Sequence, residues 1–142
     1  PFVALKTNRK GGIRAITLDE NDHLINVIRT NGNDNIILAT REGMAICFSE
    51  QDVRPMGREA AGVRGIMLTG EDYVVGAEKA EDDKTLLTVT ENGYGKRTEF
   101  KEYRSCHRGG MGVTAIKGEE RNAKLTHPDD LPLFERALAA NV

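Results

Sequence analysis

The sequence predicts an all-β, propeller-like fold made of four-stranded units, and two observations carry this prediction. The first is the alternation of short apolar runs with turn residues, with almost no helical periodicity before residue 124. Units of about 40 to 50 residues with four strands each are typical of propeller blades. The second is a repeat of 50 residues, in which Gly12, Arg14 and Ile16 return as Gly62, Arg64 and Ile66, and Gly62, Val63 and Ile66 return as Gly112, Val113 and Ile116.

The middle unit shows the whole pattern of one blade. Its β-rich apolar runs predict four strands, over residues 35–39, 44–48, 62–68 and 73–77. They are separated by a turn at 41–43, a polar connection at 49–61 and a turn at 69–72. We therefore expect a complete blade over residues 34–83.

The flanking units are shorter. The following unit predicts strands over 85–90, 94–98 and 112–117, and we expect a further blade over residues 84–122. The first unit keeps only two strands, at 12–18 and 23–28, so residues 1–33 are expected to form a partial blade.

The repeat does not continue into the last 20 residues. A strand at 123–127 would extend it, but the chain there reads Ala-Lys-Leu-Thr-His and then Pro128. Leu131, Phe134 and Leu138 fall on one helical face, with Pro132 suited to a first turn. We expect residues 123–142 to be a tail with a short helix over 132–140.

The composition is that of an ordinary globular chain of 142 residues, with 30% charged residues and a formal charge of −2. It has no apolar run of the roughly 18 residues that span a bilayer, and no signal peptide. The chain begins at Pro1 without an initiator Met, so we expect it to be cut from a longer polypeptide. Cys47 and Cys106 have no partner motif, which favours a reducing cytosol over a disulfide or zinc framework.

The sequence offers little support for catalysis. His23, His107 and His127 have no carboxylate or thiol at triad or ligand spacing. The acid pairs 82–83 and 129–130 are best interpreted as solvated turns, Cys47 as a core residue and Cys106 as an incidental thiol. We expect no catalytic residue, no metal and no cofactor in this chain.

The cations are unevenly distributed despite the acidic balance. Residues 6–14 hold four basic side chains and no acid, and residues 94–108 hold five against two acids. A polyanion that touches one face responds to such local charge rather than to the net charge.

Two segments within this distribution have competing interpretations. In the segment 106–112, three glycines beside Arg108 suit a phosphate contact, although a glycine-rich turn explains them equally well. Lys96 and Arg97 occupy positions where the previous unit has Ile46 and Cys47. That strand either faces a ligand or is a solvated edge strand protected by charge.

Three strings of residues resemble one known family. They are Glu91 to Thr98 with Glu102-Tyr103-Arg104 and Arg108 to Val113, Val53 to Arg58 with Gly62 to Ile66, and Lys10 to Ile16. Together, over about residues 1–122, they closely resemble the later blades of the C-terminal domain of bacterial DNA gyrase A. The tail is not covered by this resemblance.

The resemblance implies a six-bladed β-pinwheel, a propeller relative in which adjacent blades exchange a hairpin and duplex DNA bends around a basic rim. It implies a place in a gyrase holoenzyme with the rest of gyrase A and with gyrase B, in the bacterial cytoplasm at the nucleoid. That holoenzyme is a type IIA topoisomerase, whose ATP and Mg²⁺ bind other domains and whose strand passage introduces negative supercoils. No membrane is implied.

The segment 106–112 aligns with the family's box Gln-Arg-Arg-Gly-Gly-Lys-Gly. Arg108, Gly109, Gly110 and Gly112 match it, whereas Cys106, His107 and Met111 do not. We interpret the segment as a degenerate internal copy of that box.

We expect sequence-nonspecific contacts to DNA from one set of residues: Arg9, Lys10, Arg14, Arg58, Arg64, Lys96, Arg97, Arg104, Arg108, Gly109 and Gly110. Two alternatives are the equivalent C-terminal domain of topoisomerase IV and a propeller-like protein-interaction scaffold. Self-association through open blade edges is a further expectation.

Overall fold

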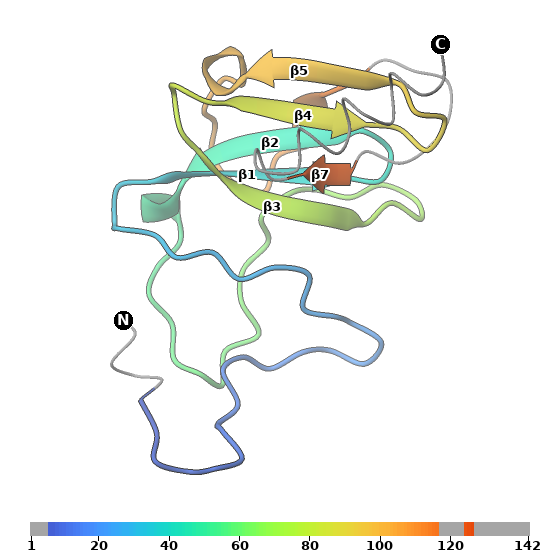
Figure 1. Ribbon diagram of the computed structural model, residues 1–142. Helices are drawn as coiled ribbons and strands as arrows, with labels where there is room; N and C mark the ends of the chain where they lie inside the picture. Colours follow the sequence, from blue (N-terminus) through green and yellow to red (C-terminus); the bar gives the residue numbers. More distant parts are fainter. Residues whose placement is uncertain (1–5, 117–123, 127–142) are drawn as a thin grey trace.

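The computed structural model describes residues 6–116 and 124–126, and within them nearly all regular structure is β (Figure 1). The elements in chain order are β1 (Asn35–Thr40), β2 (Met44–Ser49), the 3-10 helix η2 (Glu50–Asp52), β3 (Val74–Ala80), β4 (Thr85–Val89), β5 (Gly95–Glu99), the 3-10 helix η3 (Phe100–Glu102), β6 (Val113–Thr114) and β7 (Lys124–Thr126). The all-β prediction is confirmed.

The strands form two antiparallel sheets, in the orders β3-β1-β2-β6 and β5-β4-β7. Each sheet contains a hairpin whose turn is closed in the same way fifty residues apart. Gly43 and Gly93 have φ of 79° and 82°, and their N–H groups donate to Thr40 O and Thr90 O at 3.1 and 3.0 Å. Glycine adopts this left-handed conformation without strain, which explains its place in both turns.

A short strand crosses from the unit of residues 84–122 (the second unit) to the first sheet. β6 pairs with β2 through Met44↔Thr114 and Ala45↔Val113, and Ala115 N–H donates to Gly43 O at 2.8 Å. The residues before β6 in sequence belong to the second unit, whose sheet contains β4 and β5. The chain therefore links the two sheets through β6, which follows β5 in sequence and pairs with β2.

An apolar core joins the sheets face to face. Ile37 and Cys47 from the first sheet pack with Leu86, Phe100 and Tyr103 from the second unit, and all are less than 9% exposed. Burial of this much aliphatic and aromatic surface is the main favourable term holding the two units together.

A second apolar cluster lies on the other face of the first sheet. It contains the buried Ile46, Phe48 and Ile66, with Leu38 and Val74 partly buried against them. The first sheet is thus apolar on both faces, as expected of a blade stacked between neighbours.

Three predicted strands are wrong: residues 12–18, 23–28 and 62–68 are not in strands. Their sequences favour β structure, but a strand needs a partner. None of the three segments is paired with a strand of either sheet within the described residues. The predicted strand at 112–117 is only two residues long, at 113–114, within the described part.

The last described strand lies beyond the predicted end of the second described blade. Lys124–Thr126 pairs with β4 as β3 pairs with β1, so the second sheet extends into the segment that we expected to be tail. The blade boundaries stay a prediction, and the helix expected over 132–140 lies outside the described residues.

The crossing of β6 predicts unequal effects of alanine at equivalent glycines. Gly112 has φ of 76° and a Cβ there would lie 2.4 Å from Ala45 O, whereas Gly62 has φ of 96° and open space. Gly62→Ala should lower the free energy of unfolding by about 1 kcal/mol through backbone strain, and Gly112→Ala by about 3 kcal/mol or more. Urea unfolding measures both, and equal losses would contradict the crossing geometry.

The core also predicts a loss of stability at alkaline pH. Burial raises the pKa of the Cys47 thiol, and the nearby Cys106 and Asp82 add to the rise. The folded state then keeps a proton that the unfolded state releases, so the free energy of unfolding falls as pH rises above about 8.5, the thiol's unfolded pKa. Urea unfolding across this range should show a shallower decline for Cys47→Ala than for the wild type, and equal slopes would contradict the assignment.

At still higher pH a second group adds to this decline. Burial raises the pKa of the Tyr103 phenol, although the hydroxyls of Thr98 and Thr88 offset part of the rise. Within the described residues, none of these three hydroxyls makes a hydrogen bond of standard geometry, so burial prevails.

Candidate nucleic-acid interface

The glycine-rich segment 106–112 binds the preceding unit of the chain. The Arg108 guanidinium donates through Nε to Asp52 O at 2.9 Å and through Nη1 to Arg64 O at 3.0 Å. Gly109 N–H donates to Gly65 O at 2.6 Å, and Gly110 O accepts from Met67 N–H at 2.8 Å. These four bonds fasten the segment to residues 64–67 and to the end of η2.

Arg108 and Gly109 are therefore placed differently from the expectation that they face a phosphate. Arg108 is half-buried with two of its donors used on carbonyls, and the Gly109 N–H is used internally. The structural interpretation of the segment, a glycine-rich turn, is favoured here. Beside it His107 pairs with Asp52 at 3.3 Å, with the imidazole almost fully exposed.

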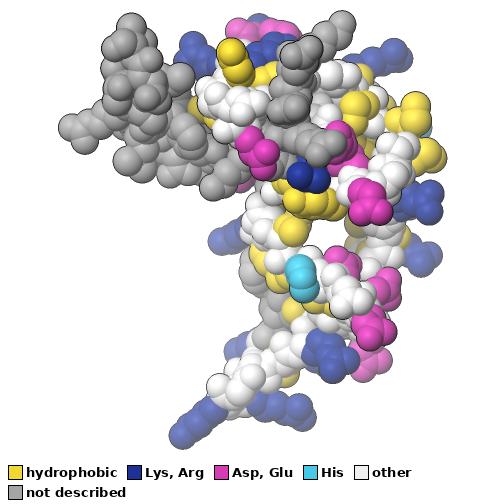
Figure 2. Space-filling view, turned by 90° about the vertical axis from the view of Figure 1, so that its right-hand side faces the viewer, with side chains coloured by type: hydrophobic (Ala, Val, Ile, Leu, Met, Phe, Trp, Pro, Cys, Tyr) yellow, Lys and Arg dark blue, Asp and Glu magenta, His cyan; other side chains and the backbone are white. Residues whose placement is uncertain are grey.

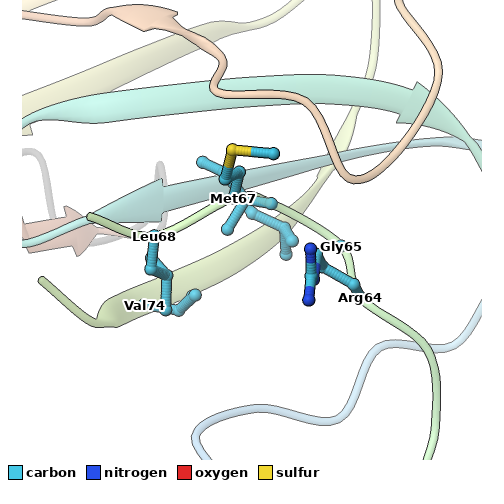
Figure 3. A pocket seen from close by; sticks show the side chains of 7 residues that line it. Arg64, Gly65, Met67, Leu68 and Val74 are labelled. Carbon is cyan, nitrogen blue, oxygen red and sulfur yellow. The ribbon is translucent and has the colours of Figure 1, made fainter. Parts of the chain in front are cut away.

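Arg64 lies at one end of a largely apolar groove (Figure 3). Leu68 and Val74 line the other end. Gly65 lies close beneath Leu38, and a Cβ there would lie 2.5 Å from the end of the Leu38 side chain. Among the described residues that line the groove, Arg64 is the one cation.

A long segment without strands precedes β1 and carries the first three predicted cations. Arg9, Lys10 and Arg14 are all exposed on it, and it extends away from the sheets (Figure 1). Two bonds fix it to the loop that carries the exposed Arg58: Thr17 N–H donates to Ala60 O at 3.2 Å and Thr17 Oγ1 to Glu59 O at 3.0 Å.

The loop contacts repeat at the same interval as the sequence. The bond from Thr17 N–H to Ala60 O is equivalent to that from Met67 N–H to Gly110 O, fifty residues on in both partners. Equivalent cations on successive units are consequently Arg14 and Arg64, and Arg54 and Arg104. Arg54 is exposed and was missing from our predicted set, although its repeat spacing could have revealed it.

The remaining predicted cations lie on the second unit. Lys96 and Arg97 are exposed on β5, opposite Thr88 and Leu87 of β4, and Arg104 is exposed after η3. On the face that Figure 2 shows, Lys and Arg side chains are spread from the segment before β1 to the sheets, with acidic side chains between them.

Other kinds of site are not found in the described residues. They contain no group of three His, Cys, Asp or Glu side chains that could hold a metal ion. They also contain no helix long and apolar enough to cross a membrane.

Interlocked antiparallel sheets with exposed cations on repeated loops define a β-propeller-type module. The family model of the DNA gyrase C-terminal domain, beta-propeller, matches residues 3–31, 34–81 and 84–129, and the chain belongs to this family.

Individual relatives agree with the family assignment. The DNA gyrase A polypeptide of Kosmotoga olearia is 48% identical over 124 residues, covering 85% of this chain and 15% of that protein. The gyrase A polypeptide of Haloquadratum walsbyi is 52% identical over 116 residues, covering 80% and 14%. The chain thus spans about 15% of the length of these curated relatives.

Solved structures show the same fold. The crystal structure of the C-terminal domain of DNA topoisomerase IV has a TM-score of 0.77 at 26% identity, covering 87% of this chain and 41% of that one. The structure of the DNA gyrase A C-terminal domain has a TM-score of 0.66 at 31% identity, covering 82% and 40%.

The contacts of Arg108 predict that it stabilises the fold, in contrast to its counterpart Arg58. Arg108→Met removes two hydrogen bonds from a charged donor to carbonyls and should lower the free energy of unfolding by about 2 kcal/mol. Arg58→Met, at an exposed side chain, should change it by less than about 0.5 kcal/mol. Urea unfolding compares the two. An Arg108→Met variant as stable as Arg58→Met would contradict a stabilising role for these two hydrogen bonds.

Proposed function

We propose that this chain binds duplex DNA without sequence preference and contributes to wrapping it. The proposal rests on one observation: exposed cations recur at equivalent loop positions on successive units of a gyrase-family module. Arg14 and Arg64 are one such pair, and Arg54 and Arg104 are another. Cations at a fixed interval along stacked blades suit the regular phosphates of a duplex and carry no information about base sequence.

The energetics require several units to act together. Each phosphate contact releases counterions and contributes about −0.9 to the slope of log affinity against log salt. Bending roughly 20 to 30 base pairs by about 40 to 90 degrees costs on the order of 1 to 6 kcal/mol. The few cations of one blade offset little of this cost, so binding by this chain should be weak and steeply dependent on salt.

In the full-length protein this module would present wrapped DNA to strand passage. We infer a role in ATP-dependent negative supercoiling, with the rest of gyrase A and with gyrase B, at the nucleoid in the bacterial cytoplasm. ATP and Mg²⁺ would act on domains outside this chain, which would supply no catalytic group.

The second candidate is a topoisomerase IV module, because the solved structure with the TM-score of 0.77 is the C-terminal domain of that enzyme. Sequence favours gyrase, since the two gyrase A relatives are about 50% identical to this chain whereas that structure is 26% identical. Replacing the corresponding segment of a gyrase A polypeptide with this chain tests the choice. Retained negative supercoiling supports gyrase, and relaxation alone supports topoisomerase IV.

DNA binding is tested with the chain itself on unrelated linear duplexes. Mobility shifts across a salt series should give tighter binding at low salt, and Arg14→Gln with Arg64→Gln should reduce the magnitude of the logarithmic salt slope by about 1.8 for every sequence. Lys101→Gln is the control, because Lys101 is exposed but ion-paired with Glu99. No binding at about 50 mM salt, or an affinity independent of salt, would refute the proposal.

A further inference from the structure

One arginine joins the two ends of the loop of residues 53–63. Arg108 Nε donates to Asp52 O at 2.9 Å, and Arg108 Nη1 donates to Arg64 O at 3.0 Å. Asp52 directly precedes this loop and Arg64 directly follows it. Because a guanidinium is planar and holds its donors in a fixed geometry, it fixes the separation of the two carbonyls. The position of Arg64 relative to η2 therefore depends on Arg108.

The three residues that follow this second carbonyl are held as well. Gly65 O accepts from Gly109 N–H at 2.6 Å, and Met67 N–H donates to Gly110 O at 2.8 Å. Ile66 between them is 5% exposed and belongs to the second apolar cluster. The backbone here is thus fixed by hydrogen bonds on both sides of a buried side chain.

The Arg64 side chain takes no part in these contacts. It is exposed at one end of the apolar groove (Figure 3), and within residues 6–116 and 124–126 its guanidinium makes no hydrogen bond or ion pair. A side chain on a fixed backbone has less freedom to lose when it binds a ligand than one on a mobile backbone. Arg64 is therefore suited to a preorganised contact with an anion.

Arg108 is placed differently, although it carries the same charge. It is half-buried, and two of its donors are used on carbonyls of the preceding unit. A direct phosphate contact through its other N–H groups is the competing role. The two roles differ in what happens when the charge is kept and the planar set of donors is removed.

We propose that Arg108 is a positioning residue for DNA binding, which acts through Arg64 and does not itself touch phosphate. This role rests on the DNA binding proposed above and adds to it a division of labour between two arginines. By holding the Arg64 carbonyl, Arg108 presents the Arg64 guanidinium at a fixed place and lowers the entropy cost of its phosphate contact.

The first experiment is a double-mutant cycle on DNA affinity. Arg108→Lys keeps the charge but loses the planar donors. With Arg64 present it should weaken binding to linear duplexes about 2- to 10-fold at fixed salt, the cost of ordering one long side chain. The salt slope should stay unchanged, because the number of cations is the same. In an Arg64→Gln background the same substitution should change affinity little, since no Arg64 contact remains to be positioned.

Arg97→Gln is the matched control for Arg64→Gln. Arg97 is exposed on β5, so its loss and that of Arg108→Lys should combine independently. Independent losses at Arg64 and Arg108, in variants whose circular dichroism is that of the wild type, would overturn the positioning role alone. A wild-type chain that does not bind duplex would overturn the proposed function and this role with it.

The second experiment needs no substitution. In the ¹H–¹⁵N spectrum of the wild-type chain the Arg108 Nε–H should exchange slowly with solvent, because its bond to Asp52 O protects it. Adding a duplex should shift the Arg64 Nε–H signal and leave that of Arg108 in place. An Arg108 signal that moves as far as that of Arg64 would show direct contact and overturn the proposal, as would an Arg64 signal that does not move.

Discussion

The pairing of β6 with β2 is the contact on which the rest of the structure depends. It brings residues of the second unit onto the first sheet, and it places Gly112 so close to Ala45 that no side chain fits. The inter-sheet core of Ile37, Cys47 and Leu86 also contains Ala115, which directly follows β6. A propeller-type stack is held by such exchange together with apolar burial, rather than by burial alone.

The cations fall into two groups according to what their side chains contact. Arg108 uses its guanidinium to join two backbone carbonyls, whereas Arg14, Arg58 and Arg64 leave theirs in solvent. Residues that look equivalent by sequence therefore differ in role, and a basic loop in a repeat cannot be assigned to DNA by charge alone. Removing an exposed cation weakens a salt-dependent contact, while removing a bonded one loosens the scaffold that spaces the others.

The two hairpins were predictable because their signals are local. Glu-Gly and Asn-Gly turns between apolar runs specify β1 with β2 and β4 with β5 without reference to the rest of the chain. The segments 12–18 and 62–68 have equally good β sequences, but whether they become strands depends on a partner elsewhere. β7 was missed for the opposite reason, since its short polar sequence becomes a strand only against β4. The exposure of the cations was likewise predictable. The two hydrogen bonds of the Arg108 side chain were not, because they depend on carbonyls 44 and 56 residues away.

The span between β2 and β6 has a consequence for synthesis of the protein. Thr114 follows its partner Met44 by 70 residues, so the first sheet stays incomplete until most of the next unit has left the ribosome. At about 5 to 20 residues per second the β2 edge waits roughly 4 to 14 s for its neighbour. During that interval a nascent chain offers an unpaired strand to other nascent chains, and the timing of translation becomes part of how this array avoids joining the wrong blades.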